Sequence, residues 1–389
     1  MTKNAPELRF KGFTDDWELR KLGEVSDIIA GGDIDSSILK ETGAFPVIAN
    51  AITDDGIVGY YDSKFRVIAP AVTVVGRGVG VGRAQVRYKS FTPVIRLLSV
   101  KAKKHDAKFL ESIINEYKII MESTGVPQLT VPQLKQYRLY LTSLAEETQI
   151  GNFFTCFDNI LALHQRKLDL LNQLKQAYLQ KMFPKNGEKV PEIRFADFDE
   201  KWEQRKLAGL ADFSKGNGYT KNDLTEIGNP IILYGRLYTK YQTIINNVDS
   251  FAIEKDNSVI SKGNEVIVPA SGETSKDISR ASVIGKPGII IGGDLNIIRP
   301  KKFIDSVFLA LTISNGTQQK EMTKRAQGKS VVHLHNSDLK QVNLLYPELE
   351  EQKQIGFFFK QFDNIVDIQQ NLITQLNILK SAFLKKMFI

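Results

Sequence analysis

The sequence predicts an α+β fold of two tandem mixed β/α domains, each followed by a long helix, with the two helices pairing as an antiparallel coiled coil of pseudo-twofold symmetry. The main observation is an internal repeat. Residues 149–183 recur as residues 354–388, and both stretches begin Gln-Ile-Gly, continue with Phe-Asp-Asn-Ile and end Lys-Met-Phe, at an offset of 205 residues. Two copies of one plan therefore follow each other along the chain.

The second observation is the spacing of apolar residues within these two stretches. They recur at alternating steps of three and four, which is the heptad pattern of a coiled-coil seam. The residues expected to pair the helices are Phe153, Phe157, Ile160, His164, Leu171 and Leu174 in the first stretch and Phe358, Phe362, Ile365, Gln369, Leu372, Leu376 and Leu379 in the second.

The two seams break their apolar pattern at His164 and Gln369. Antiparallel pairing would bring these positions near the midpoint, where a polar layer fixes alignment at some loss of stability. The alternative is that His164 lies on the helix surface because the seam is locally irregular. A helix of about 38 residues spans roughly 57 Å, so the pair would act as a spacer of fixed length.

A second repeat lies at the start of each copy. Residues 6–22 recur as residues 191–207, at an offset of 185, so the second copy has gained 20 residues between its two anchors. We divide the chain into a domain at 1–142, a helix at 143–184, a second domain at 185–346 and a second helix at 347–389. The ends of the copies match and the middles differ, as expected if a common frame carries two specificities.

Each middle consists of short β-rich runs separated by Gly, Asp and Pro, followed by one helical run. The expected strands of the first are 47–49, 65–68, 72–75, 84–88 and 94–98, with a helix at 108–122. Those of the second are 231–234, 243–245, 265–268, 281–284 and 289–291, with a helix at 304–315.

The starts of both long helices carry capping residues. Ser143 stands three residues before Glu146, the spacing of a capping box. Pro347 is followed by Glu348, Glu350 and Glu351, acids that suit the positive end of a helix dipole. We therefore place the helix starts near these residues.

Composition limits the protein class. With 42% hydrophobic and 25% charged residues, the 389-residue chain resembles ordinary folded proteins, and it contains no run long and apolar enough for a membrane span. The first six residues lack the apolar core of a signal peptide, so we expect a cytoplasmic location. The single cysteine, Cys156, excludes an internal disulfide and is expected to be a buried, inert thiol.

A basic segment in the first middle is the clearest electrostatic signal. Between Ser63 and His105 there are ten Lys and Arg residues and no Asp or Glu, in a chain of net charge +8. Such a stretch on strands and turns can face phosphates, although a solvated basic face is the alternative. The expected DNA contacts are Lys64, Arg66, Arg77, Arg83, Arg87 and Lys89.

Residues 76–83 alternate glycine with arginine and valine but match neither phosphate-loop motif, so a glycine-rich hairpin near DNA fits better. The second middle is more aromatic, and residues 234–241 interleave tyrosines with cations. Its expected base-reading residues, which ordinary surface loops would explain equally well, are Tyr234, Arg236, Tyr238, Lys240, Ser271, Thr274, Lys276 and Arg280.

We find no catalytic constellation. Residues 229–232 are not the Asn-Pro-Pro-aromatic box of an adenine methyltransferase, and the Glu-x-Lys spacing of residues 351–353 falls in the first turn of a predicted helix. His333 and His335 alternate on a possible strand without a third ligand, so we expect no metal site.

This layout resembles the specificity subunit of type I restriction-modification systems over nearly the whole chain. The resemblance rests on the half-repeats, on residues 123–130 (Ser-Thr-Gly-Val-Pro-Gln-Leu-Thr) before the first helix, and on the Lys-Met-Phe helix ends. It implies that residues 1–142 and 185–346 are target recognition domains, each reading half of a bipartite DNA site. It also implies that the helices form an antiparallel spacer. In the second copy residues 325–332 replace the 125–130 run, so contacts in that loop should not be transferred between copies.

The resemblance further implies a subunit that is not an enzyme and binds no cofactor itself. Its expected partners are double-stranded DNA, two methyltransferase subunits that use S-adenosylmethionine, and restriction subunits that translocate and cut DNA with ATP and Mg²⁺; no membrane is involved. The alternatives are a stand-alone methyltransferase or nuclease, which the missing motifs oppose, and a coiled-coil scaffold that makes no DNA contact through its basic segment.

Overall fold

The computed structural model describes residues 4–117, 126–326 and 331–389. For Lys276 it describes the backbone only. The chain forms two compact units. Unit 1 comprises Met1–Arg166 and Asn371–Ile389, and unit 2 comprises Lys167–Gln370. Each unit is therefore assembled from a domain, part of the helix that follows it and part of the other long helix.

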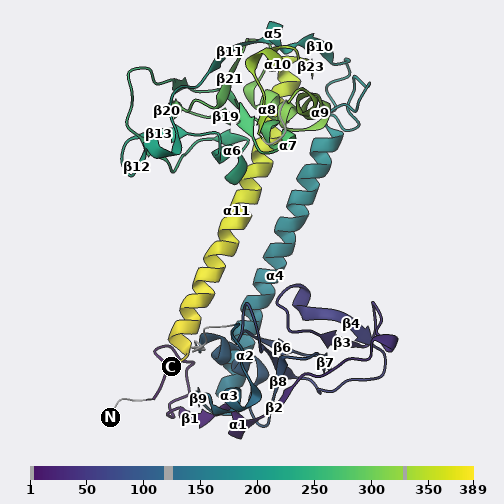
Figure 1. The fold of residues 1–389 in the computed structure, drawn as a ribbon, viewed down its shortest axis with the longest axis vertical. Helices are drawn as coiled ribbons and strands as arrows, with labels where there is room; N and C mark the ends of the chain where they lie inside the picture. The colour runs from purple at the N-terminus through teal and green to yellow at the C-terminus, as the bar shows by residue number, and fades with distance from the viewer. Residues whose placement is uncertain (1–3, 118–125, 327–330) are drawn as a thin grey trace. The chain divides into compact units, whose positions relative to one another are not determined.

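Unit 1 contains the first domain and the beginning of the first long helix (Figure 1). Its elements in chain order are β1 (Glu18–Lys21), α1 (Leu22–Val25), β2 (Ser26–Ala30), η1 (Ser36–Ile38), β3 (Phe45–Ile48), η2 (Asp54–Gly56), β4 (Ile57–Tyr61), β5 (Ala71–Val75), β6 (Ala84–Arg87), β7 (Thr92–Pro93), β8 (Leu97–Ala102), α2 (Ala107–Glu116), α3 (Val131–Gln136), β9 (Arg138–Leu141) and α4 (Leu144–Lys181).

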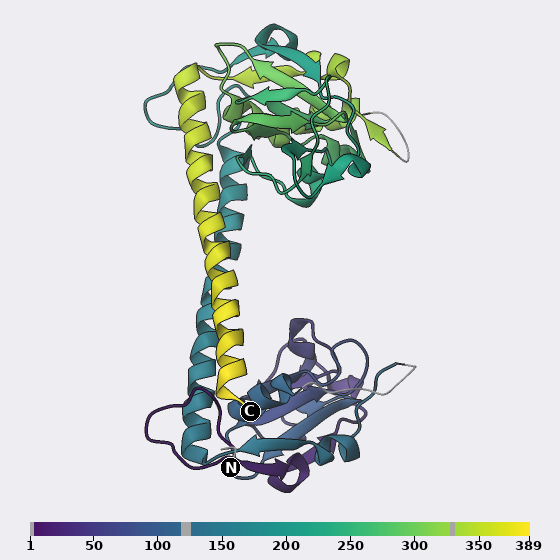
Figure 2. The ribbon, with the colours of Figure 1, turned by 90° about the vertical axis from the view of Figure 1, so that its left-hand side faces the viewer.

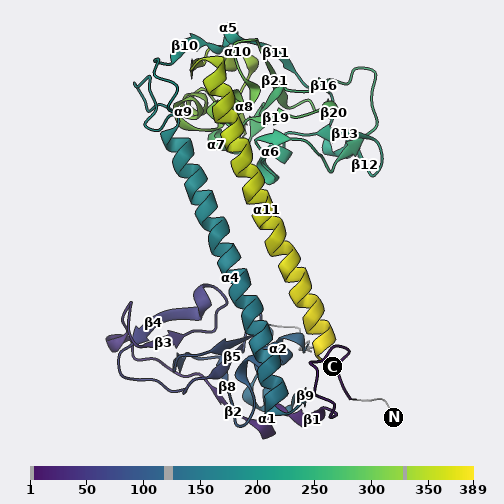
Figure 3. The ribbon, with the colours of Figure 1, turned by 180° about the vertical axis from the view of Figure 1, so that it is seen from behind.

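The core of unit 1 forms around an antiparallel sheet of order β2-β8-β5-β6. All five residues of β5 are buried because both faces of this strand are covered. Val72 and Val74 lie in the same cluster as side chains of α2, while Ala71 packs with Ile48 of the smaller sheet β4-β3-β7. The domain is thus layered as helix, sheet and small sheet, and Figure 3 shows β3 and β4 beside β5 and β8.

Unit 2 repeats this plan with additional elements. They are β10 (Glu203–Lys206), α5 (Leu207–Leu210), β11 (Ala211–Lys215), η3 (Lys221–Asp223), β12 (Leu224–Thr225), β13 (Asn229–Ile232), α6 (Arg236–Thr239), β14 (Ile244–Ile245), β15 (Phe251–Ala252), β16 (Ile260–Lys262), β17 (Val266–Pro269), β18 (Ser271–Gly272), α7 (Ser275–Ile278), β19 (Ser282–Ile284), β20 (Pro287–Ile291), β21 (Leu295–Pro300), α8 (Ser306–Ser314), α9 (Gly316–Arg325), β22 (Val332–His333), α10 (Asn336–Lys340), β23 (Asn343–Tyr346) and α11 (Leu349–Met387).

The central sheet of unit 2 has the order β11-β21-β17-β19-β14. As in unit 1, the central strand is buried on both faces: Val266 and Val268 lie in the core cluster that contains α8, and Ile267 lies in a cluster with residues of β13 and β20. A second sheet of order β12-β15-β13-β20-β16 takes the place of the small sheet. The prediction of two tandem mixed β/α domains is confirmed.

The two long helices pack antiparallel within each unit. In unit 1 the ring of Phe383 lies 5.1 Å from that of Phe153 and 5.8 Å from that of Phe157. In unit 2 the ring of Tyr178 lies 5.1 Å from that of Phe358 and 6.1 Å from that of Phe362. Every residue of the first contact has its counterpart 205 positions away in the second, so the two pairings are equivalent, as the repeat predicts.

An ion pair accompanies each aromatic contact. Lys380 donates to Asp158 at 2.5 Å in unit 1, and Lys175 pairs with Asp363 in unit 2. These pairs are also related by the offset of 205. Antiparallel pairing is therefore specified in each unit by an aromatic cluster and one lysine–aspartate bridge.

The predicted phase of the seam is half wrong. Ile160, Leu174, Ile365 and Leu379 were expected inside, yet their exposed fractions are 37%, 46%, 48% and 45%. Of the other predicted members, Phe153, Phe358 and Leu372 are half-buried. A continuous heptad row of buried or half-buried side chains nevertheless follows the other phase, in which each copy has two polar or charged members. In the first copy it consists of Ile150, Phe154, Phe157, Leu161, His164, Leu168, Leu171, Lys175 and Tyr178, and the equivalent row of the second copy runs from Ile355 to Phe383. The apolar pairs at 160–161 and 365–366, in which either residue could face the partner helix, left the phase ambiguous in the sequence.

The central positions of the seam behave differently in the two copies. Gln369 is buried and His164 is half-buried, so neither lies on a fully exposed surface. The polar layer that would join them stays a prediction.

The end of each long helix completes the core of a domain that it does not follow. Phe388 contacts Trp17 of unit 1 at a ring distance of 6.2 Å, and Phe183 contacts Trp202 of unit 2 at 6.1 Å. Figure 2 shows the C-terminus of the chain beside the N-terminal domain. A backbone hydrogen bond also joins the end of α11 to the N-terminal domain, because the Leu8 amide donates to the Lys386 carbonyl at 2.8 Å.

A buried arginine–glutamate pair joins the start of each domain to the first turn of a long helix. Arg9 donates through Nε and Nη2 to the Glu146 carboxylate at 2.6 and 2.8 Å, and Arg194 donates to Glu351 at 2.8 and 2.7 Å. Both glutamate side chains are fully buried. The expected capping box is only half formed, because Ser143 accepts from the Glu146 amide while the Glu146 carboxylate binds Arg9 instead.

Several local predictions need correction. Residues 65–68 are not a strand, since only Val67 forms an isolated bridge, with Phe91. The strand predicted from residue 94 begins at Leu97, because Arg96 has a left-handed φ of 75° that interrupts extended structure. Cys156 is exposed rather than buried, since the buried side of α4 runs through Phe154.

The predicted helix 108–122 ends at Glu116, and residues 118–122 fall outside the described residues. None of the described helices combines the length and apolar character needed to cross a bilayer.

Candidate nucleic-acid interface

The basic segment of unit 1 runs along β5, β6 and β8 and the turns between them. Lys64 and Arg66 lie in the loop between β4 and β5, Arg83 lies in the 76–83 turn and Lys89 follows β6, and all four side chains are exposed. Positive side chains therefore reach solvent on both sides of β5, where a phosphate backbone could approach them.

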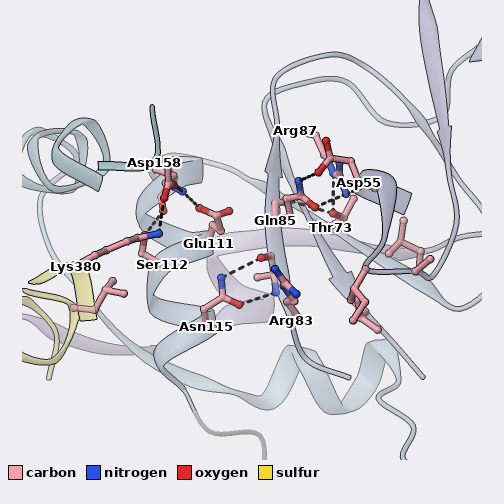
Figure 4. Close-up of a pocket in the computed structure, with 17 residues that line it drawn as sticks. Asp55, Thr73, Arg83, Gln85, Arg87, Glu111, Ser112, Asn115, Asp158 and Lys380 are labelled. Carbon is pink, nitrogen blue, oxygen red and sulfur yellow. Dashed lines mark hydrogen bonds and ion pairs between the residues drawn. The ribbon is translucent and has the colours of Figure 1, made fainter. Parts of the chain in front are cut away.

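Arg87 is held differently from the other basic residues. It donates through Nε to Thr73 Oγ1 at 3.0 Å and through Nη2 to the Asp55 carbonyl at 2.9 Å and to Gln85 Oε1 at 2.8 Å (Figure 4). Burial lowers the pKa of this guanidinium, and nearby Asp55 and Glu111 oppose the effect. Arg87 therefore ties β6 to the turn before β4, and its Nε and Nη2 already have partners inside the protein.

A polar cavity of about 280 Å³ lies in unit 1 where α2 meets the two long helices (Figure 4). Lys108 of α2 pairs with Glu111 and, at 2.5 Å, with Asp158 of α4, which also accepts from Lys380 of α11. Burial alone would lower the pKa of Lys108, but the two carboxylates outweigh it and raise the pKa. Lys108, Glu111, Asp158 and Lys380 are thus satisfied by one another and join the domain to both helices.

The same network lowers the pKa of its central carboxyl, that of Asp158. Burial tends to raise the pKa of Asp158, while hydrogen bonds from Lys108 and Lys380 lower it further than burial raises it. In unit 2 the residue equivalent to Lys108 is Val307, so the corresponding Asp363 pairs with Lys175 without such a lysine. The cavity network is specific to unit 1.

A short two-stranded ribbon extends from the central strand of each domain. In unit 1 Arg77 pairs antiparallel with Gln128, with the Leu129 amide donating to the Gly76 carbonyl at 2.7 Å and the Gly78 amide donating to the Pro127 carbonyl at 3.0 Å. Asn50 holds this ribbon, accepting from the Gly76 amide and donating to the Arg77 carbonyl at 2.7 and 2.8 Å. The backbone around Arg77 is therefore fixed.

In unit 2 the ribbon consists of β18 and β22, in which Ser271 pairs with His333. The Leu334 amide donates to the Ala270 carbonyl at 3.0 Å, and Tyr238 Oη donates to the Ser271 carbonyl at 2.5 Å. Burial raises the pKa of the Tyr238 phenol. Tyr238 thus holds a ribbon carbonyl as Asn50 does, and its hydroxyl points toward the protein rather than toward solvent.

The remaining candidates of unit 2 surround this ribbon. Arg236 is only 10% exposed and binds Asp249 at 2.9 Å, so this guanidinium holds a loop together. Lys240 is exposed and shares Asp249, and Thr274 caps α7 by accepting from an amide of that helix. Tyr234 is half-buried beside α6, and Arg280 follows α7 in contact with Asp277; the side chain of Lys276 lies outside the described residues.

Sequence reasoning missed the ribbon partners and the cavity network. Gln128 and His333 pair with predicted contact residues. A possible strand was expected at His333 but without a pairing partner, and Gln128 carries no local strand signal. The aspartate–lysine bridges could have been found, because Asp158 and Lys380 both repeat at the 205-residue offset, whereas Lys108 has no counterpart. Within the described ranges no three His, Cys, Asp or Glu side chains are grouped to bind a metal ion.

Comparison with known proteins places this fold. The family described as the type I restriction modification DNA specificity domain matches residues 14–173 and 199–377. The MjaVIII specificity subunit of a type I restriction enzyme from Methanocaldococcus jannaschii is 22% identical over 95% of this chain and 91% of its own length. A putative type I specificity subunit of Mycoplasma pneumoniae, S.MpnORF507P, is 26% identical over 43% of this chain and 48% of its own length.

Two solved structures share the fold. The type I restriction-modification S subunit from M. genitalium has a TM-score of 0.67, with 16% identity over 99% of both chains. A chain from a study of complex assembly and conformational transition of the type I restriction-modification system has a TM-score of 0.57, with 16% identity over 98% of this chain and 99% of that one. Because the family match covers both domains and both helices, the chain belongs to the family of type I restriction-modification DNA specificity proteins.

Proposed function

We propose that this chain is the sequence-recognition and assembly subunit of a type I restriction-modification complex, in which each domain reads one half of a bipartite DNA site. One observation carries the proposal: two equivalent frames hold middles of different sequence. Frame contacts such as Arg9–Glu146 and Arg194–Glu351 repeat at fixed offsets, while the surfaces presented between them differ. This arrangement is expected of a protein that presents recognition surfaces for two different DNA sequences on one scaffold.

The basic segment of unit 1 supplies the sequence-independent part of binding. Its exposed cations neutralise phosphates, and each phosphate contact contributes about 0.9 to the slope of log affinity against log salt. Lys64, Arg83 and Lys89 are the residues expected to do this, since Arg87 is tied inward. The chain itself makes no covalent change in DNA and binds no cofactor. Methyltransferase subunits with S-adenosylmethionine, and restriction subunits with ATP and Mg²⁺, act beside it in the cytoplasm.

The experiment uses the complete chain bound to its methyltransferase partner. Changing Arg83 and Lys89 together to alanine should weaken binding to duplex DNA and reduce the salt slope by about 2, without altering the preferred sequence. The matched control removes Lys11 and Lys135, which are exposed outside the basic segment and should leave both quantities unchanged. Unchanged affinity and slope in the first variant would favour the coiled-coil scaffold, which needs no DNA contact there.

The paired helices are proposed to set the spacing of the two half-sites and to dock the partner subunits. Seven residues, one heptad, inserted into both α4 and α11 keep the seam in register and lengthen each helix by about 10 Å, near three base pairs of DNA rise. Insertion after Arg166 and after Gln370, at the boundary of the two units, should lengthen the recognised spacer by roughly that amount. A methylation motif with an unchanged spacer would refute the role of the helices as a ruler.

A further inference from the structure

The cross-strand pairs Arg77–Gln128 and Ser271–His333 occupy the same place in the two domains. The first strand of each ribbon continues directly from the central strand, β5 or β17, and the second leads into α3 or α10. Gln128 and His333 are separated by the offset of 205, and the following residues, Leu129 and Leu334, are both buried anchors. The two pairs are therefore equivalent positions on a common backbone.

The hydrogen-bond pattern determines where these side chains lie. In both ribbons the amide after the second residue of the pair donates to the carbonyl before the first, as from Leu129 to Gly76 and from Leu334 to Ala270. This pattern marks a pair without mutual backbone hydrogen bonds, whose side chains lie closest together on one face. Because the anchoring leucines point into the core, the paired side chains point outward; Gln128 and His333 are exposed, and Arg77 and Ser271 are half-buried.

The frame of the ribbon is kept while its outward side chains are exchanged. The carbonyl of the first member is held in both units, by Asn50 on Arg77 and by Tyr238 on Ser271. The outward pair is arginine with glutamine in one unit and serine with histidine, joined at 3.2 Å between Ser271 Oγ and His333 Nδ1, in the other. A fixed backbone with different hydrogen-bonding groups at one site is suited to discrimination.

We propose that these two pairs are base-reading elements, each for one DNA half-site; the inference rests on the proposed function and adds the residues that specify sequence. The major groove admits a two-stranded ribbon. Arginine makes two hydrogen bonds to guanine O6 and N7, and glutamine makes two to adenine N6 and N7, so Arg77 and Gln128 read purines. Ser271 and His333 have shorter side chains with other donors and acceptors, and they read a different base sequence.

Fixed geometry separates these residues from the phosphate-binding cations. A side chain that must meet a base edge needs a positioned backbone, and both pairs have one. Arg83 and Lys89 are exposed, on a turn and after a strand end, and neither belongs to a ribbon pair. Changes at the pairs should therefore alter sequence preference, while changes at the cations should alter affinity on every sequence.

The test uses the full chain in complex with its methyltransferase partner and a library of duplex DNA randomised across the site, with bound sequences read out. In the wild-type complex the library yields a bipartite motif. Arg77→Ala with Gln128→Ala should reduce discrimination roughly 10- to 100-fold at one or two positions of one half-site and leave the other half-site sharp. Ser271→Ala with His333→Ala should affect the opposite half-site.

A matched control replaces the same residue types elsewhere in unit 1. Arg138→Ala with Gln136→Ala, on exposed positions of β9 and α3, should leave the motif unchanged. Thermal unfolding of each variant, together with the retained half-site, confirms that the protein is folded. As a second arm, Ser271→Arg with His333→Gln should introduce a purine preference into the second half-site.

The outcomes distinguish a failure of the proposed function from a failure of the base-reading role of the ribbons. A wild-type complex that selects no bipartite motif would refute the proposed function itself. A wild-type bipartite motif that persists unchanged in the alanine variants would refute only the base-reading role of the ribbons. An equal loss of affinity on all sequences, with the motif retained, would also overturn it and assign Arg77 to phosphate contact.

Discussion

Removing the charge of Glu146 should destabilise unit 1 severely. The Glu146 side chain has no exposure to solvent, and Arg9 is 12% exposed. In Glu146→Gln the guanidinium stays buried and loses a charged partner that it meets at 2.6 and 2.8 Å. Removing one partner of a buried ion pair costs about 3–5 kcal/mol. We expect the lower end, about 3 kcal/mol, because Arg9 keeps some access to water and glutamine retains one acceptor.

The assay uses the two tryptophans of the chain as reporters. Trp17 belongs to the core of unit 1 and Trp202 to that of unit 2, and both are buried. In a Trp202→Phe background, fluorescence during urea unfolding follows unit 1. There Glu146→Gln should lower the midpoint markedly, and a thermal midpoint should fall by roughly 6–12 °C for a unit of this size.

Two controls test the reasoning. Glu41→Gln changes an exposed carboxyl of unit 1 and should shift stability by no more than about 0.5 kcal/mol. Replacing Arg9 and Glu146 together by methionine removes both buried charges and should restore most of the loss. A loss below about 1 kcal/mol in Glu146→Gln, or a double variant as unstable as the single one, would refute the view that the buried guanidinium dominates.

Three further predictions use tryptophan fluorescence: the first two follow Trp17 in the Trp202→Phe background, and the third, which concerns residues of unit 2, follows Trp202 in a Trp17→Phe background. Asp158 has a lowered pKa, so its pairing stabilises unit 1 above its ordinary pKa of about 4 and is lost as pH falls through the lowered value; the stability difference between wild type and Asp158→Asn should vanish over that window. Phe388→Ala should destabilise unit 1 by about 3–5 kcal/mol and Ile389→Ala, at an exposed position, by much less; equal effects would refute a helix end that completes the core. Leu168→Ala should cost about 2–5 kcal/mol and Leu174→Ala under about 1 kcal/mol, and the reverse order would restore the seam phase expected from sequence.

Sequence analysis predicted correctly the features that belong to the internal repeat. The 205-residue offset located both long helices to within a few residues and predicted their antiparallel pairing, because equivalent residues must occupy equivalent places. Glu146 and Glu351 were recognised as first-turn acids, yet their binding to Arg9 and Arg194 was not predicted. Both members repeat in the sequence, at different offsets, so the signal was present but required knowledge of the fold to be read.

Predictions failed where tertiary contacts override local pattern. Lys175 is half-buried at an inner helical position because it reaches Asp363, while the apolar Leu174 beside it is exposed. A prediction from hydrophobicity alone therefore placed Leu174, rather than Lys175, at the inner position. Similarly, the charge of Arg87 suggested a phosphate contact, but only the fold reveals that Thr73 and Asp55 already use its donors.

The structure separates two kinds of information within one chain. Residues that join a domain to the helices, such as Trp17, Phe388 and their counterparts Trp202 and Phe183, repeat at fixed offsets because both units need the same packing. A change there unfolds a unit and removes binding altogether. The ribbon residues take no part in these Trp–Phe contacts, so we expect that they can be exchanged without loss of the fold. If the ribbons read bases, new specificities can therefore arise through a few substitutions at positions such as 77 and 128, while the frame remains constant.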